Sequence, residues 1–126
     1  MEQNYNVIYV MSVDYPQLKG LVKIGQAPIT LDVDPSSIND NDEKMMQAVK
    51  DDMKQMEERT GCNMPYQIDY CTIGINNKTH QSISNLDVHQ YLRGKGILPV
   101  QPTMMNGWYR LPVDMAVLSI KDVKNK

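Results

Sequence analysis

The sequence predicts an α+β fold in which a small antiparallel sheet of three strands, or slightly more, is flanked by helices. Three patterns indicate this class: two β-branched runs around a connector with Pro and Gly, a methionine stripe at helical spacing, and a third run with strand-like alternation. The apolar stripe of a helix needs a sheet or another helix to bury it. At 126 residues, we expect positions 1–126 to form one domain with a single modest core.

The first two strands are predicted to form a hairpin. Residues 7–13 (VIYVMSV) and 21–24 (LVKI) are rich in β-branched residues, and a connector with a proline and a glycine separates them. Because side chains alternate along a strand, Lys23 points to the face opposite its two apolar neighbours. Lys23 is therefore a cation on a strand beside Tyr9 and Tyr15.

Residues 27–41 (APITLDVDPSSINDN) are predicted to form a polar, acidic loop after the hairpin. At about fifteen residues the segment is longer than the usual connection, and such loops are functional or mobile. Its aspartates lack the regular spacing and the closing glutamate of a calcium-binding loop. We therefore interpret this loop as solvated rather than metal-binding.

A long helix is predicted to follow the loop, with Asp40 or Asp42 as its N-cap and Gly61 at its C-terminal end. Its apolar side chains recur at helical spacing and form one stripe: Met45, Met46, Val49, Met53 and Met56. Such a stripe is more typical of core packing than of a methionine-rich ligand site.

The second half of the chain is predicted to contain a third strand over 66–73, in which three residues alternate with three others: Tyr66, Ile68 and Tyr70 against Gln67, Asp69 and Cys71. A second helix is expected to begin near Thr79 or Ser82 and to end at Arg93. That helix places Asn85 and His89 on one face. A short strand over 108–111 and a last helix over 112–120 complete the prediction.

Charge is distributed unevenly along the chain, whose net charge is −2. Residues 1–60 carry six bases against eleven acids, and residues 61–126 carry seven bases against four acids. Proteins that bind nucleic acid usually present a basic face, because phosphate contacts supply most of the affinity. The balance argues against strong non-specific DNA binding and leaves one candidate local patch: Lys19, Lys23, Arg93, Lys95 and Arg110.

Cysteine usage and hydropathy predict an intracellular, cytoplasmic protein. Cys62 and Cys71 lack the spacing of a metal site, and the N-terminus does not resemble a secretory signal, so we expect reduced thiols. A membrane-spanning helix needs about 20 consecutive apolar residues, and the longest apolar run falls well short of that length. We therefore expect no membrane partner.

Two motifs in the hairpin, residues 8–10 (IYV) and 22–25 (VKIG), resemble the signature of the GIY-YIG endonuclease superfamily. The likeness is to the phage and bacterial branch whose second motif reads Lys-Ile-Gly. Further fragments are similar to that branch in the same order: Thr60-Gly61, Pro65-Tyr66, the helix around His89, and Gly107-Trp108-Tyr109. The resemblance implies a GIY-YIG nuclease-like fold, with the acidic loop at about 27–41 as an insertion.

In that superfamily the implied activity is hydrolysis of a phosphodiester with Mg²⁺ or Mn²⁺. A tyrosine near the metal assists the attacking water, an arginine on the first helix stabilises phosphate charge, and a glutamate on a later helix holds the metal. Tyr9 matches the tyrosine of the first motif. The alternative is that Tyr9 has only a structural role, as a partly buried tyrosine of the sheet. Lys23 stands where the second tyrosine would be, where its ammonium could hold a phosphate oxygen or simply be solvated.

Two positions depart from the family pattern. Asp52 occupies the place of the helix arginine and has the wrong sign for a phosphate clamp. Arg59 lies about 10 Å further along the helix and would substitute only if that helix were shifted by two turns. Asn85 occupies the place of the metal-binding glutamate and offers no charge, whereas hard cations prefer carboxylates. His89 is retained, but a histidine on an apolar helix face is more often a hydrogen-bonded core residue.

Three functions from different classes follow from these residues. The first is a degenerate GIY-YIG domain that binds nucleic acid weakly, or a protein partner, with little or no cleavage. The second is an active endonuclease with displaced ligands, in which Tyr9, Lys23 and Arg59 act and Mg²⁺ or Mn²⁺ is the cofactor. The third is a small protein-interaction domain unrelated to nucleic acid. Loss of the arginine and the glutamate favours the first, with the acidic loop and the first helix expected to border its cleft.

Overall fold

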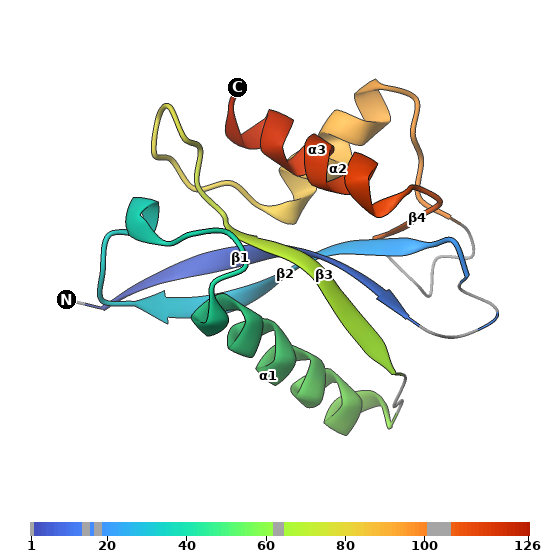
Figure 1. Cartoon of the computed structure of the whole chain (residues 1–126), viewed down its shortest axis with the longest axis horizontal. Helices are drawn as coiled ribbons and strands as arrows, with labels where there is room; N and C mark the ends of the chain where they lie inside the picture. Colours follow the sequence, from blue (N-terminus) through green and yellow to red (C-terminus); the bar gives the residue numbers. More distant parts are fainter. Residues whose placement is uncertain (1, 14–15, 17–18, 62–64, 101–106) are drawn as a thin grey trace.

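The centre of the fold is a four-stranded antiparallel sheet in the order β3-β1-β2-β4 (Figure 1). In this computed structural model, the described residues are 2–13, 16, 19–61, 65–100 and 107–126. The strands are β1 (Gln3–Val13), β2 (Val22–Leu31), β3 (Tyr66–Ile73) and β4 (Trp108–Tyr109). The predicted α+β class is confirmed, and the sheet has one strand more than the minimum of three.

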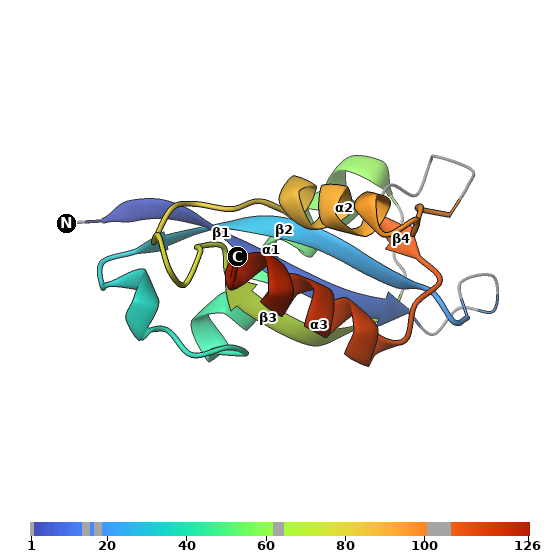
Figure 2. The same cartoon turned by 90° about the horizontal axis from the view of Figure 1, so that it is seen from above.

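Helices cover both faces of the sheet. α1 (Glu43–Thr60) lies on one face, and α2 (Asn85–Gly94) and α3 (Val113–Lys124) lie on the other (Figures 1 and 2). Because side chains alternate along β1, Tyr9 packs with the α1 cluster and Val10 packs with the α2 and α3 cluster. Met45 and Val49 of α1 are fully buried. The prediction that the methionine helix packs on one face of the hairpin sheet is therefore confirmed.

The ends of α1 follow the capping prediction. The Asp42 carboxylate accepts a hydrogen bond from the Lys44 backbone N–H at 2.9 Å, which satisfies one of the free donors of the first turn. At the other end, Gly61 has φ 70° and closes the helix in the left-handed conformation.

The second helix begins later than predicted. α2 starts at Asn85 rather than near Thr79 or Ser82, because Ser84 and Asp87 form a capping box at its first turn. Before it, the Asn76 side chain accepts two backbone N–H groups in a turn, and Ser82 forms an isolated β-bridge with Ile75. These contacts hold the preceding segment in non-helical conformations.

The predicted loop over 27–41 is partly wrong, because β2 continues to Leu31 and the loop begins at Asp32. Ala27 and Leu31 are buried against the α1 cluster, and their alternation sustains the strand. Pro28 is tolerated inside the strand because it lies where its missing N–H would face away from β1. This orientation follows from the outward hydrogen bond that the Ile24 N–H donates to Gly107.

A bulge in β3 breaks the alternation predicted for that strand. Val10 of β1 pairs with Tyr70 and Met11 pairs with Ile68, so Asp69 is an extra residue between two consecutive pairs. As a result Ile68 packs with the α1 cluster, whereas Tyr70 packs on the opposite face. The prediction that these two residues share one face is wrong.

The last elements also differ from the prediction in length. β4 ends at Tyr109 instead of Leu111, and α3 continues to Lys124 instead of ending near Ile120. Within the described parts of the chain, no helix has both the length and the apolar character needed to cross a membrane.

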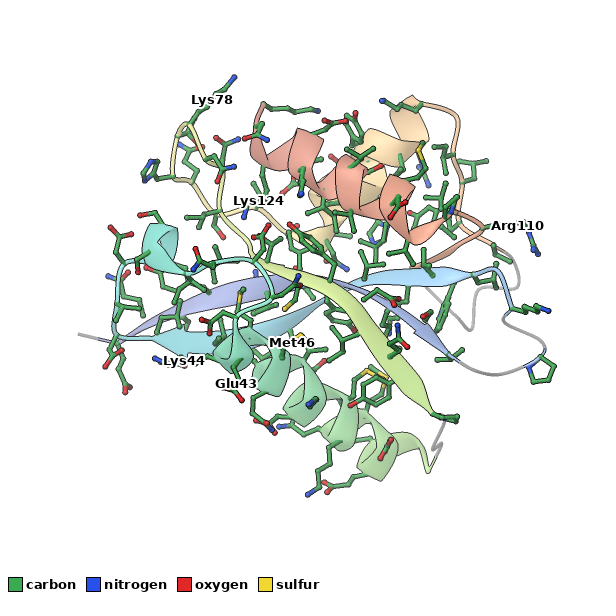
Figure 3. All side chains as sticks on the ribbon, in the orientation of Figure 1. Glu43, Lys44, Met46, Lys78, Arg110 and Lys124 are labelled. Atoms are coloured by element: carbon green, nitrogen blue, oxygen red, sulfur yellow. The ribbon has the colours of Figure 1, made fainter. Side chains whose placement is uncertain are left out.

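Asp40 fastens the acidic loop to the sheet and to α3. The hydroxyls of Tyr70 and Thr72 both donate to its carboxylate at 2.6 Å. The buried Lys124 ammonium in turn donates to the Thr72 hydroxyl oxygen. Figure 3 shows Lys124 between α3 and the sheet. A chain of hydrogen bonds thus links a buried cation to a carboxylate through one threonine.

Candidate functional site

A cavity of about 470 Å³ lies at the edge of β2, beside Gly25 and next to the end of β4. β1, β2, α1 and α2 all contribute side chains to its lining. Six of the residues singled out in the sequence lie in that lining: Tyr9, Lys23, Asp52, Asn85, His89 and Arg93. Positions that are up to 84 residues apart in the chain therefore meet at one place.

The other candidate residues lie elsewhere. Arg59 is exposed in the last turn of α1 and is not in the cavity lining. Lys19 also lies outside that lining. Lys95 has its ammonium 4.8 Å from the centre of the Tyr91 ring, and Arg110, labelled after β4 in Figure 3, lies beside Gly20 and lines a different cavity. Tyr15 lies outside the described residues.

The acidic loop does not border this cavity, contrary to expectation. Residues of the loop, including Asp40, line a different cavity together with Lys121 of α3. α1 does border the predicted cleft, through Asp52. Asp52 is the one carboxylate among the described residues that line the cavity.

Tyr9 is placed by a glycine on the neighbouring strand. Tyr9 and Gly25 are direct cross-strand partners, and the Tyr9 ring lies over the glycine. A Cβ atom at position 25 would stand 2.6 Å from the Tyr9 hydroxyl oxygen and 2.7 Å from its ring carbon Cζ. Any larger residue at position 25 would overlap the Tyr9 ring, so the close approach requires glycine. The absence of a side chain there lets the Tyr9 hydroxyl lie directly over Gly25.

Burial makes the Tyr9 hydroxyl harder to deprotonate. Desolvation, followed by the negative charge of Asp52 and the proximity of Tyr66, raises the pKa of Tyr9 to about 12. At neutral pH the phenolate fraction is then on the order of 10⁻⁵. Tyr9 thus acts as a hydrogen-bond donor in the cavity rather than as a base.

The raised pKa of Tyr9 predicts a loss of stability in alkali. The folded state holds this proton more tightly than the unfolded chain, so its contribution is complete below pH 10 and falls as pH rises through about 12. At pH 11 the loss attributable to Tyr9 is about 1.4 kcal/mol. Guanidinium unfolding at pH 8 and pH 11, followed by fluorescence of the buried Trp108, measures it.

The Tyr9→Phe variant is the control for this effect, because Cys71 and Tyr70 also have raised pKa values and both proteins retain them. Lys23 and Lys124 have lowered pKa values and act in the opposite direction in both proteins. The wild-type advantage over Tyr9→Phe should therefore shrink between pH 8 and pH 11. An unchanged difference would contradict a buried, protonated Tyr9.

Lys23 is held in the cavity by strands on both sides. Its backbone pairs with Met11 of β1 and with Trp108 of β4, and its side chain is half-buried. Desolvation lowers the pKa of the Lys23 ammonium, and the negative charge of Asp52 opposes this effect in part. The Lys23 backbone is therefore fixed between two strands, and burial disfavours the charged form of its amine.

His89 is a partnered, neutral histidine. Its Nδ1 lies 2.5 Å from the Tyr109 hydroxyl oxygen, and the two rings are stacked with centroids 5.4 Å apart. Burial lowers the pKa of His89, which outweighs the opposing hydrogen bond to the Ile24 backbone. The interpretation of His89 as a hydrogen-bonded histidine on the core side of its helix agrees with these contacts.

Asn85 is tied to β2 at the start of α2. Its backbone N–H donates to the Gln26 side-chain carbonyl at 3.1 Å, and its side-chain nitrogen lies 3.5 Å from His89 Nε2. Gln26 thus joins the first turn of α2 to the strand that carries Lys23. This link positions the helix beside the cavity.

The donor set does not fit a magnesium or manganese ion. Such ions prefer carboxylate oxygens, and the described lining offers one carboxylate, Asp52, together with the neutral Asn85. Throughout the described residues, no group of three or more His, Cys, Asp or Glu side chains could hold a metal ion. What the cavity does provide is hydrogen-bond donors for an anion: Tyr9, Lys23, Arg93 and the amide of Asn85.

Sequence reasoning missed two contributors to the site. The sequence places Tyr109 only in a fragment that is similar to the GIY-YIG branch, whereas in the structure its hydroxyl is the partner of His89. Gln26 was not singled out, and its only signal is its place directly after the second motif. Both roles depend on contacts between distant segments, which no local pattern encodes.

Comparison with family models, with curated proteins and with solved structures gives no match for this chain. A functional assignment therefore depends on the geometry and chemistry of the cavity itself.

Proposed function

We propose that the cavity beside Gly25 is the phosphodiester-binding cleft of a degenerate GIY-YIG-like domain, which binds nucleic acid weakly and cuts it little or not at all. The observation that carries the proposal is the meeting of six separated positions in one cavity. Five of them, Tyr9, Lys23, Asp52, Asn85 and His89, are the positions at which the resemblance expects active-site groups.

The chemistry of the lining favours binding over hydrolysis. Lys23 and Arg93 supply positive charge, and the protonated Tyr9 supplies a donor for a phosphate oxygen. The positions that should stabilise charge in the transition state are occupied by Asp52 and Asn85. Each lost electrostatic group reduces the rate on the order of 10²–10³-fold. A single phosphate held without a metal is the outcome that these groups support.

The binding prediction compares two lysines. Lys23→Ala should weaken binding of a fluorescein-labelled oligonucleotide about tenfold, because one charge-assisted hydrogen bond is lost. Lys121→Ala, on the exposed side of α3, removes the same charge away from the cleft and should change the affinity little. Fluorescence anisotropy at two salt concentrations measures both, and binding should fall as salt rises. Equal losses for the two variants would place the nucleic-acid surface elsewhere.

The cleavage prediction is little or no nicking of supercoiled plasmid with Mg²⁺ or Mn²⁺, for the reasons given above. Agarose gel electrophoresis after prolonged incubation measures it, with a known nuclease as positive control. Robust nicking that Tyr9→Phe abolishes would overturn the degenerate assignment. Arg59 and a carboxylate beyond those named here would then be the first groups to examine.

A further inference from the structure

Lys23 and Asp52, an amine and a carboxylate, line the same cavity, and phosphodiester hydrolysis does not explain their combination. The Asp52 charge acts on both Lys23 and Tyr9. Asp52 has the wrong sign for a phosphate clamp, and an amine is not a ligand for a hard metal ion. Imine chemistry needs an amine nucleophile together with a proton donor and a proton acceptor, and Lys23, Tyr9 and Asp52 are residues of these types.

We propose that this cleft cleaves nucleic acid at abasic sites without a metal, with Lys23 as the nucleophile that forms an imine with the sugar aldehyde. The inference rests on the proposed function, because the other donors of the cavity, Arg93 and the Asn85 amide, must hold the flanking phosphate while Lys23 reacts with the sugar. It differs in the reaction, which is an elimination rather than a hydrolysis.

The reaction is balanced with water alone. The Lys23 Nζ forms a bond to C1′ of the ring-opened deoxyribose, and the carbonyl oxygen leaves as water, with Tyr9 as the proton donor. The protonated imine acidifies C2′, and Asp52 removes a proton there. The electron pair forms the C2′–C3′ double bond and breaks the C3′–O bond, which releases the 3′ phosphate. One water then hydrolyses the imine and restores the free amine.

The geometry suits each role. Pairing with both β1 and β4 fixes the Lys23 backbone, and the residue lines the cavity. Burial lowers the pKa of Lys23, which increases the fraction of neutral amine. Tyr9, which is protonated at neutral pH, lines the same cavity and can donate a hydrogen bond there. Arg93, which also lines the cavity, provides a cation for the phosphate.

Borohydride trapping tests the imine directly. The full chain is incubated with a labelled oligodeoxynucleotide that carries one abasic site, and sodium borohydride then reduces any imine to a stable secondary amine. We expect a covalent adduct on a denaturing gel and the mass increment on Lys23 after proteolysis. Lys23→Arg keeps the positive charge but cannot form the imine, so the adduct should fall at least tenfold. Lys121→Arg is the matched control and should leave the adduct unchanged.

A second oligonucleotide separates this inference from the proposed function. A tetrahydrofuran analogue of the abasic site lacks the aldehyde, so it reports binding alone. Lys23→Arg should bind it within about threefold of wild type. Two results would overturn the inference of imine-based cleavage: binding of the analogue without any trapped adduct, or an adduct that persists in Lys23→Arg. Neither result would contradict the proposal that the cavity binds nucleic acid. If neither oligonucleotide binds, both the proposed function and the inference are overturned. A circular dichroism spectrum that matches wild type shows that each variant is folded.

Discussion

Thr72→Val should destabilise the protein by about 3 kcal/mol, although the two side chains have nearly the same shape. Thr72 is completely buried and carries the hydrogen-bond chain from Lys124 to Asp40. Without its hydroxyl, the buried Lys124 ammonium loses its acceptor and its connection to the carboxylate. An uncompensated buried charge of this kind typically costs about 3–5 kcal/mol, and the exposed position of Asp40 moderates the effect. Chemical unfolding monitored by circular dichroism measures the change.

A double variant isolates the cause of that loss. Lys124→Met replaces the cation by an apolar side chain of similar length, so combining it with Thr72→Val should recover part of the lost stability. Thr30→Val, at an exposed position of β2, is the matched control and should change stability by less than about 0.5 kcal/mol. Simple additivity of the Thr72 and Lys124 variants would show that the two side chains are not coupled.

Gly25→Ala should lower the free energy of unfolding by about 1–3 kcal/mol, because the added methyl overlaps the buried Tyr9 ring. The ring is packed in the α1 cluster and cannot move without disturbing it. The displaced hydroxyl should also weaken oligonucleotide binding. Thermal or chemical unfolding, paired with anisotropy on the same sample, measures both effects.

Two further variants test whether the overlap with the Tyr9 ring causes the stability loss of Gly25→Ala. Gly94→Ala adds the same methyl at the end of α2, where no atom lies within 4 Å, and should be neutral or slightly stabilising. Shortening the partner, in Gly25→Ala with Tyr9→Leu, should destabilise less than the sum of the two single variants. If Gly25→Ala changed the free energy of unfolding as little as Gly94→Ala, the close approach of Tyr9 to Gly25 would not contribute to stability.

Local patterns predicted most of the fold. The methionine stripe and the caps at Asp42 and Gly61 depend on neighbouring residues and predicted α1 with boundaries close to the observed ones. The hairpin alternation predicted the pairing of β1 with β2 but not their lengths, since β1 begins at Gln3 and β2 ends at Leu31. Long-range contacts account for the errors. The bulge at Asp69 and the extension of β2 to Leu31 are set by pairing with β1, which no short window of sequence displays.

In the candidate site, too, local patterns predicted some residues, whereas their long-range partners could not be predicted. Motif resemblance selects Tyr9 and Lys23, and helical spacing puts Asn85 and His89 on one face, but their meeting in one cavity also requires α2 to pack beside β2. The partners of those residues could not be predicted. Tyr109 contacts His89 because β4, a strand of two residues, pairs with the edge of β2. β4 and β2 are far apart in the sequence, so no local pattern predicts this pairing.

The short pairing of β4 leaves most of the outer edge of β2 uncovered in the described structure, where Gln26, Pro28 and Thr30 direct their backbone groups outward. An open, β-branched edge is a template on which strands of other molecules can add. Pro28 interrupts that template, since it offers no N–H at the centre of the exposed row. The proline inside the strand thus protects the chain against edge-to-edge aggregation while the edge stays accessible beside the cavity.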